Sequence, residues 1–165
     1  MKNRVGLGFD IHPFGVAPPL VLGGVMIDGS PRLAGHSDGD AIAHAVADSL
    51  LGPTGLPDLG TLFPADDEQL RDADSMQLLG DVAVRAADLG WWVENVDIVV
   101  AAEQPRLAPY VEMMVANVVS ALARTREPMG SGINVAIRPK RGEGLGAIGR
   151  AEGIAVWAVA ALFRH

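Results

Sequence analysis

Residues 4–13 read Arg-Val-Gly-Leu-Gly-Phe-Asp-Ile-His-Pro, and this stretch decides the fold together with the helix that we expect to follow it. The loose alternation of small and apolar residues predicts a β-strand that ends at Pro13. Side chains two residues apart point to the same face of a strand, so Asp10 and His12 share one face near its end. A carboxylate and an imidazole are therefore presented side by side.

The next element brings a second histidine to this region. Residues 37–40, Ser-Asp-Gly-Asp, supply helix caps, and we expect a helix from there to about Leu51. The helical repeat places Asp40 and Asp48 one turn on either side of His44. His44 is thus the third metal-binding side chain within the first 44 residues that could face the strand end.

Asp10, His12 and His44 form a common three-ligand zinc set that leaves a fourth position open for water or substrate. The alternative that spacing leaves open is a surface Asp-x-His pair and an unrelated helical histidine held by a carboxylate one turn away. The segment 36–40, His-Ser-Asp-Gly-Asp, also has two interpretations. Free N–H groups at a helix N-terminus attract phosphate, and the same residues form an ordinary turn with an N-cap.

The remaining pattern predicts an α+β fold, with one domain over residues 1–165 and a mixed β-sheet whose helices pack on one face. We expect a hairpin or bulge at 20–27, a loop at 52–68, helices at 75–90, 109–124 and 151–164, strands at 91–102 (bulged at 94–95) and 133–138, and a glycine-rich loop at 139–149. The expected helix at 151–164 is apolar around most of its circumference. That surplus apolar surface favours burial between subunits in a cyclic homo-oligomer.

Composition excludes several function classes. The chain has 20 acidic and 13 basic residues, a net charge of −7, which argues against general affinity for nucleic acid or anionic membranes. It has no cysteine, which rules out a disulfide scaffold and a thiolate zinc site. Its longest apolar run, 154–163, is too short to cross a bilayer, and we find no signal or transit pattern, so we expect a cytoplasmic protein.

Residues 144–149, Gly-Leu-Gly-Ala-Ile-Gly, match the dinucleotide-binding pattern G-x-G-x-x-G. We reject that interpretation because no strand is expected after the following helix and no acidic residue can lie about 20 positions further on. Beside this loop lie four basic residues, Arg138, Lys140, Arg141 and Arg150. They can hold a phosphorylated ligand or form a solvated loop.

Two loop carboxylates, Asp58 and Glu143, are candidates for a Mg²⁺ ion that keeps waters and binds through substrate phosphates. Each residue is otherwise a solvated turn residue.

Six motifs, in order and over essentially the whole chain, resemble the 2-C-methyl-D-erythritol 2,4-cyclodiphosphate synthase family. They are Gly8-Phe9-Asp10-Ile11-His12, His36-Ser37-Asp38-Gly39-Asp40-Ala41 with His44, Asp58-Leu59-Gly60 with Leu62-Phe63-Pro64, Ala73-Asp74-Ser75 with Leu78-Leu79, Asn95-Val96-Asp97, and Gly149-Arg150-Ala151-Glu152-Gly153. The resemblance implies a lyase of the non-mevalonate isoprenoid pathway. Such a lyase converts 4-diphosphocytidyl-2-C-methyl-D-erythritol 2-phosphate to 2-C-methyl-D-erythritol 2,4-cyclodiphosphate and releases CMP.

The resemblance also implies a homotrimer with interfacial active sites, Zn²⁺ held by Asp10, His12 and His44, and Mg²⁺ or Mn²⁺ that bridges substrate phosphates at Glu143. It assigns catalytic roles to His36, Arg141 and Asp58. The substrate-binding residues that it implies are Asp10, His12, His36, Ser37, Asp58, Leu59, Gly60, Phe63, Asp67, Ala102, Pro105, Arg106, Ala108, Lys140, Arg141, Glu143, Ala147 and Arg150. Within this set, the backbone of residues 102–108 is expected to cradle cytosine from a neighbouring subunit.

The chain departs from the family pattern on the phosphate and nucleotide side. Residues 139–143, Pro-Lys-Arg-Gly-Glu, stand where the family has a threonine-rich stretch, Ala147 replaces a bulky residue, and Arg106 replaces a lysine. Lys140 and Arg141 can replace hydroxyl contacts with stronger point charges. The alternatives are a paralogue that performs the same cyclisation on another nucleotide diphosphate, and a non-catalytic trimeric diphosphate-binding protein.

Overall fold

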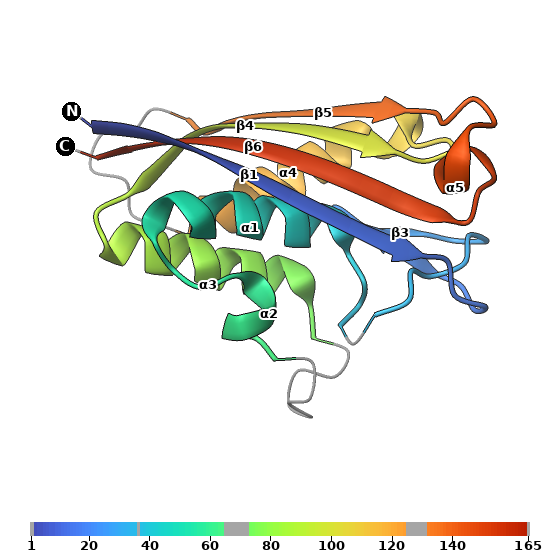
Figure 1. Ribbon diagram of the computed structural model, residues 1–165, viewed down its shortest axis with the longest axis horizontal. Helices are drawn as coiled ribbons and strands as arrows, with labels where there is room; N and C mark the ends of the chain where they lie inside the picture. The colour runs from blue at the N-terminus through green and yellow to red at the C-terminus, as the bar shows by residue number, and fades with distance from the viewer. Residues whose placement is uncertain (1, 36, 65–72, 125–131, 165) are drawn as a thin grey trace.

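A four-stranded sheet in the order β1-β6-β4-β5 carries the fold of this computed structural model, which describes residues 2–35, 37–64, 73–124 and 132–164 (Figure 1). The strands are β1 (Lys2–Pro13), β4 (Trp92–Ala101), β5 (Asn134–Lys140) and β6 (Gly153–Arg164), and a separate hairpin consists of β2 (Leu20–Leu22) and β3 (Val25–Ile27). β6 runs antiparallel to both β1 and β4, whereas β4 and β5 are parallel. The predicted mixed sheet is therefore confirmed.

Helices cover one face of this sheet (Figure 1). The helices of the described residues are α1 (Ala41–Thr54), α2 (Leu59–Leu62), α3 (Ser75–Asp88), the 3₁₀ helix η2 (Ala108–Tyr110), α4 (Val111–Leu122) and α5 (Gly146–Gly149), of which α5 lies at one end of the sheet (Figure 1). α1 lies against β1 and β6, α4 lies against β5, and α3 packs across α1 and α4 as an outer layer. The α+β class predicted from the sequence is confirmed. Among the described residues, no helix has the length and apolar character needed to cross a membrane.

β1 and α1 approach each other backbone to backbone. Gly6 and Gly8 occupy the face of β1 that meets α1. A Cβ atom at Gly8 would lie 1.9 Å from the carbonyl oxygen of Ala45, and one at Gly6 would lie 2.0 Å from that of Ser49. No side chain fits in such a gap. Because Asp10 follows Gly8 on the same face, this close approach brings Asp10 toward α1.

Asp40 fixes the start of α1. Its buried carboxylate caps the helix by accepting hydrogen bonds from the N–H groups of Ile42 (3.0 Å) and Ala43 (3.1 Å). It also accepts from Gly23 (2.9 Å) and Gly24 (2.6 Å) in the turn between β2 and β3. Burial raises the pKa of Asp40, and the hydrogen bonds from these two glycines oppose that rise. The hairpin expected at Gly23-Gly24 is present, and it is tied to the helix that carries His44.

The prediction of a helix at residues 151–164 was wrong, because this segment forms β6. β6 is an inner strand, hydrogen-bonded to β1 on one side and to β4 on the other. Its inner face is buried, while Trp157 and Val159 on the other face are 40% and 41% exposed. An apolar run on both faces of an inner strand resembles an all-apolar helix, and the alanines strengthened the helical interpretation. The apolar surface that we assigned to a helix is therefore the open face of the sheet.

Other differences are smaller. α1 continues one turn beyond Leu51, through Pro53, and ends at Gly55, whose φ of 81° is left-handed. The bulge expected in β4 lies between Val93 and Asn95. The segments at 52–68 and 139–149, expected as loops, contain the one-turn helices α2 and α5. A strand does follow the G-x-G-x-x-G segment, contrary to one of our reasons for rejecting dinucleotide binding, but a four-residue helix is not the long helix of that motif.

Candidate functional site

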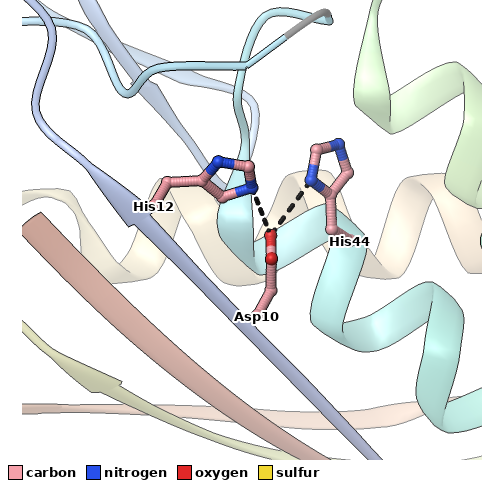
Figure 2. Close-up of side chains that lie close together, drawn as sticks. All are labelled: Asp10, His12 and His44. Carbon is pink, nitrogen blue, oxygen red and sulfur yellow. Dashed lines mark hydrogen bonds and ion pairs between the residues drawn. The ribbon is translucent and has the colours of Figure 1, made fainter. Parts of the chain in front are cut away.

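The strand end and α1 bring three metal-binding side chains together. The Oδ2 atom of Asp10 lies 2.8 Å from Nε2 of His12 and 3.1 Å from Nδ1 of His44 (Figure 2). One donor atom from each of the three residues lies within 4.8 Å of the others. Across the described ranges, this is the single group of three or more histidine or carboxylate side chains that meets that condition. The predicted Asp10, His12 and His44 constellation is therefore present.

The other nitrogen of each ring has its own partner. Nδ1 of His12 lies 2.6 Å from the carbonyl oxygen of Ala34, to which it donates a hydrogen bond as N–H. Nε2 of His44 lies 2.9 Å from the hydroxyl oxygen of Ser75. These contacts leave Nε2 of His12 and Nδ1 of His44 to face the carboxylate. In metal centres, such partners fix the tautomer and the orientation of the ring that binds the ion.

The charge of the site favours an ionised carboxylate. Burial by itself would raise the pKa of Asp10, but hydrogen bonds from His12 and His44 outweigh it and lower that pKa to about 2. The hydrogen bond to Asp10 raises the pKa of His12 above its ordinary value. One carboxylate oxygen and two imidazole nitrogens that converge on one point fit the ligand preferences of Zn²⁺. The residues can therefore hold a metal ion.

Ser75 and Asp38 form a hydrogen-bonded network with the His44 nitrogen that faces away from Asp10. The Ser75 hydroxyl group, buried at the start of α3, donates to Oδ1 of Asp38 at 2.5 Å, and its N–H donates to Oδ2 at 3.1 Å. Ser75 can therefore accept from His44 while it donates to Asp38. The sequence pattern did not predict this contact between Asp38 and Ser75, because it joins segments 37 residues apart.

We expect Ser75→Ala to weaken zinc binding by about 10- to 100-fold, since loss of an outer-shell partner leaves the His44 ring free to turn. A competition titration with a chromophoric chelator measures the change. Ser120→Ala is a matched control, because Ser120 is exposed on α4 and makes no contact with the site. Equal zinc affinity in Ser75→Ala and the parent protein would show that Ser75 only caps and packs α3.

A pocket of about 310 Å³ opens beside the three residues. It is lined by Asp10, His12, Gly35, Ser37, His44, Asp48, Leu59, Gly60, Phe63, Pro64 and Leu78. Asp48, one helical turn after His44, accepts a hydrogen bond from the N–H of Leu59 at 2.9 Å, and burial raises the pKa of Asp48. Asp48 was absent from our predicted binding residues, although its spacing from His44 was visible in the sequence. Its hydrogen bond to Leu59 connects the wall of the pocket to the helix that carries His44.

The predicted segment 58–60 is only partly in the pocket. Leu59, Gly60 and Phe63 line it, whereas Asp58 is exposed and caps α2 by accepting from the N–H of Thr61 at 2.8 Å. Hydrogen bonds from Thr61 lower the pKa of Asp58.

Three further residues were predicted to bind substrate. Ser37 is in place, with its hydroxyl oxygen 3.2 Å from Nε2 of His44. His36 and Asp67 lie outside the described residues.

A second group of predicted residues lies apart from this pocket. The pocket lining includes none of Ala102, Pro105, Arg106, Ala108, Lys140, Arg141, Glu143, Ala147 and Arg150. The two segments that carry them adjoin each other: the N–H of Ala102 donates to the carbonyl oxygen of Lys140 at 2.9 Å. Arg141 pairs with Glu103, a residue that none of the sequence motifs singled out. The geometry thus provides two groups of predicted site residues on one chain.

A mixed sheet with helices on one face and an Asp-His-His centre beside an open pocket defines a class of metal-binding α+β proteins that can accommodate small ligands. Within that class, the chain belongs to the YgbB family, which its sequence matches over residues 3–163.

Relatives match the chain over nearly its full length. The chain is 43% identical over 162 residues to 2-C-methyl-D-erythritol 2,4-cyclodiphosphate synthase of Thermosynechococcus vestitus. This alignment covers 98% of this chain and 97% of the relative. The bifunctional IspDF structure from Campylobacter jejuni superimposes with a TM-score of 0.89 at 36% identity, over 99% of this chain and 43% of that longer chain. The CDP complex of Plasmodium falciparum IspF gives a TM-score of 0.79 at 33% identity, over 98% and 96% of the two chains.

Proposed function

We propose that the chain converts 4-diphosphocytidyl-2-C-methyl-D-erythritol 2-phosphate to 2-C-methyl-D-erythritol 2,4-cyclodiphosphate and CMP. The observation that carries the proposal is the convergence of Asp10, His12 and His44 beside a pocket in a member of this family. The names of the relatives favour this substrate over a different nucleotide diphosphate and over a non-catalytic binding role. The substrate is a soluble, polyanionic metabolite, which supports a cytoplasmic site of action.

The reaction needs no nucleophile from the protein. An oxygen of the substrate's 2-phosphate forms a bond to the β-phosphorus of the diphosphate, and the bond to CMP breaks with its electron pair on the leaving phosphate. Catalysis of such a step consists mainly of positioning and charge stabilisation. The chain must therefore bend a polyanion so that its two phosphate ends meet.

The described residues have defined tasks in this scheme. Asp10, His12 and His44 would hold Zn²⁺ and Glu143 would hold Mg²⁺ or Mn²⁺, and these ions would supply charge neutralisation at the phosphoryl oxygens. Ser37 offers a hydroxyl group beside His44 for a phosphate oxygen. The short turn at Leu59 and Gly60, fixed by Asp48, places backbone groups against the erythritol part.

The nucleotide half of the site is proposed to come from a neighbouring subunit of a homotrimer. Residues 102–108 and 139–150 carry the cytosine and phosphate contacts that the family resemblance implies, and they lie outside the pocket lining. The open face of the sheet supports assembly. Leu7 and Phe9 are 67% and 47% exposed, and they lie opposite Val159 and Trp157 on β6. Such a contiguous apolar surface is typical of a subunit interface.

We expect Leu7→Asp to convert the trimer to monomers and to abolish activity, because a carboxylate in the centre of an apolar interface is costly to desolvate. Sedimentation equilibrium measures the mass. Met113→Asp is the control, since Met113 is 55% exposed on α4, on the helical side of the sheet. A parent protein that sediments as a monomer would contradict the proposed assembly.

The proposed function is tested by CMP release and phosphorus NMR on zinc-loaded protein with the cytidyl substrate and Mg²⁺. We expect a cyclic diphosphate product that forms in step with CMP. CMP release without a cyclic product, or no turnover by a zinc-loaded trimer, would overturn the proposal.

A further inference from the structure

Glu103 joins the two segments of the proposed nucleotide half of the site, residues 102–108 and 139–150. It lies two residues after the end of β4 at Ala101 and is the second residue of the segment 102–108. Its Oε1 atom accepts hydrogen bonds from Nη2 and, at 3.1 Å, from Nε of Arg141. Its Oε2 atom accepts from the N–H groups of Gly142 (3.0 Å) and Glu143 (3.1 Å). Four donors from three consecutive residues thus converge on one carboxylate.

The turn at Gly142 and Glu143, which donates hydrogen bonds to Glu103, has an unfavourable backbone conformation. Glu143 has a φ of 50°, in the left-handed region that residues with a Cβ seldom occupy. Gly142 is closely packed, since a Cβ atom there would lie 2.4 Å from the backbone nitrogen of Gly149. A left-handed residue at a functional position persists only when its surroundings hold it. The N–H of Glu143 is held directly by Oε2 of Glu103.

Charge and burial suit Glu103 to this task. Its side chain is 13% exposed, whereas that of Arg141 is 59% exposed. The hydrogen bond from Arg141 lowers the pKa of Glu103, so the carboxylate stays ionised at neutral pH. Hydrogen bonds to an ionised acceptor are stronger than those to a neutral one. Arg141 therefore has a structural partner on its own chain, in the position where the family resemblance gives a threonine.

We infer that Glu103 is a positioning residue that clasps the loop carrying Glu143 to the base-binding segment, and that Arg141 acts chiefly by holding Glu103. This inference rests on the proposed function for its consequence in catalysis. The hydrogen bonds from Arg141, Gly142 and Glu143 to Glu103, which we call the clasp, are a property of the fold. It assigns Arg141 a different task from direct phosphate contact. It also predicts that occupancy of residues 102–108 by a nucleotide favours a cation at Glu143, because one carboxylate anchors both segments.

Three substitutions separate the parts of the clasp. Glu103→Gln keeps a carbonyl oxygen that can accept from Gly142 and Glu143, but it loses the charge that holds Arg141. Arg141→Ala removes the ion pair and leaves the carboxylate on the two N–H groups. Glu103→Ala removes both sets of contacts. Asp81→Ala is the control, because Asp81 is an exposed partner of Arg124 on the far helical layer.

The first readout needs neither substrate nor an ion at Glu143. Hydrogen exchange of the peptide spanning residues 140–149 is measured by mass spectrometry in zinc-loaded protein. We expect faster exchange in Glu103→Ala, a smaller increase in Arg141→Ala and Glu103→Gln, in which the contacts of residue 103 with Gly142 and Glu143 can remain, and no change in Asp81→Ala. Unchanged exchange in Glu103→Ala would overturn the clasp whether or not the protein is a cyclodiphosphate synthase.

The second readout is the affinity of the protein for Mn²⁺ with and without CDP. Electron paramagnetic resonance measures the concentration of the free ion. We expect CDP to tighten Mn²⁺ binding in the parent protein. In Glu103→Ala we expect Mn²⁺ affinity and kcat to fall by about 10- to 100-fold. Glu103→Gln should recover most of this loss. Equal losses in Glu103→Gln and Glu103→Ala would overturn the inference that the hydrogen bonds from Gly142 and Glu143 to residue 103 hold the loop.

The two proposals fail differently. Glu103-dependent exchange and Mn²⁺ binding in a protein that makes no cyclic product would overturn the proposed function and support the clasp. Normal turnover and Mn²⁺ binding in Glu103→Ala would overturn the positioning role and leave the proposed function standing.

Discussion

His44→Ala is expected to abolish stoichiometric zinc binding and to lower kcat/KM by at least about 1,000-fold. The substitution removes one of two imidazoles that converge on Asp10, and two remaining donors cannot hold a structural or catalytic zinc ion firmly. A fall of that size corresponds to about 4 kcal/mol of lost transition-state stabilisation, within the range that a metal ion supplies. Zinc content by atomic emission and the rate of CMP release are the measurements.

The three ligands should behave as a unit. Asp10→Asn and His12→Ala should each cost nearly as much as His44→Ala, and the double variant His12→Ala with His44→Ala should cost little more than either alone. Melting of the metal-free proteins checks that the fold survives each change. A His44→Ala protein that retains one zinc per chain, or that keeps a tenth of the parent activity, would refute the assignment of the centre.

Gly8→Ala is expected to destabilise the protein by about 3 kcal/mol and to disrupt the metal centre two residues away. The added Cβ atom would lie 1.9 Å from the carbonyl oxygen of Ala45, so β1 and α1 must separate. For a chain of this length the melting temperature should fall by roughly 6–12 °C. Asp10 on the strand and His44 on the helix would then move apart, and zinc affinity should fall together with stability. Thermal melting and a chelator titration measure the two effects.

Gly52→Ala is the matched control for this experiment. Gly52 lies near the end of the same helix, and a Cβ atom there would meet nothing within 4 Å. Alanine at this position should stabilise α1 by about 0.5–1 kcal/mol through its higher helix propensity. If Gly8→Ala left both melting temperature and zinc affinity unchanged, the backbone contact between β1 and α1 would not be what sets the spacing of the ligands.

The sequence predicted the parts of the molecule that local rules decide. Strand alternation placed Asp10 and His12 on one face, and the helical repeat placed His44 beside a capped helix start. The segment 151–164 was assigned to a helix because a local pattern cannot show that a strand will have neighbours on both edges. β6 is explained by β1 and β4, which pair with it from far away in the chain.

The supporting contacts of the site escaped prediction for a related reason. Ser75 lies 31 residues from His44, and Arg141 lies 38 residues from Glu103. Neither pair has a spacing rule, so each partner looked like an ordinary cap or loop residue. Asp48 differs, because the helical repeat predicts that it lies one turn from His44. The sequence pattern did not predict that the turn at Leu59 provides a hydrogen-bond donor to the Asp48 carboxylate.

The strand order also governs when the site can form as the chain leaves the ribosome. β1 is synthesised before every other strand, yet its neighbour in the sheet is β6, the last strand described, with Lys2 opposite Arg164 and Pro13 opposite Gly153 (Figure 1). Contacts between such distant segments form slowly because the chain must close a long loop first. We expect the segment that carries Asp10 and His12 to lack its sheet neighbour until β6 has been translated. We therefore expect a metal ion to bind at Asp10, His12 and His44 only after β1 has paired with β6.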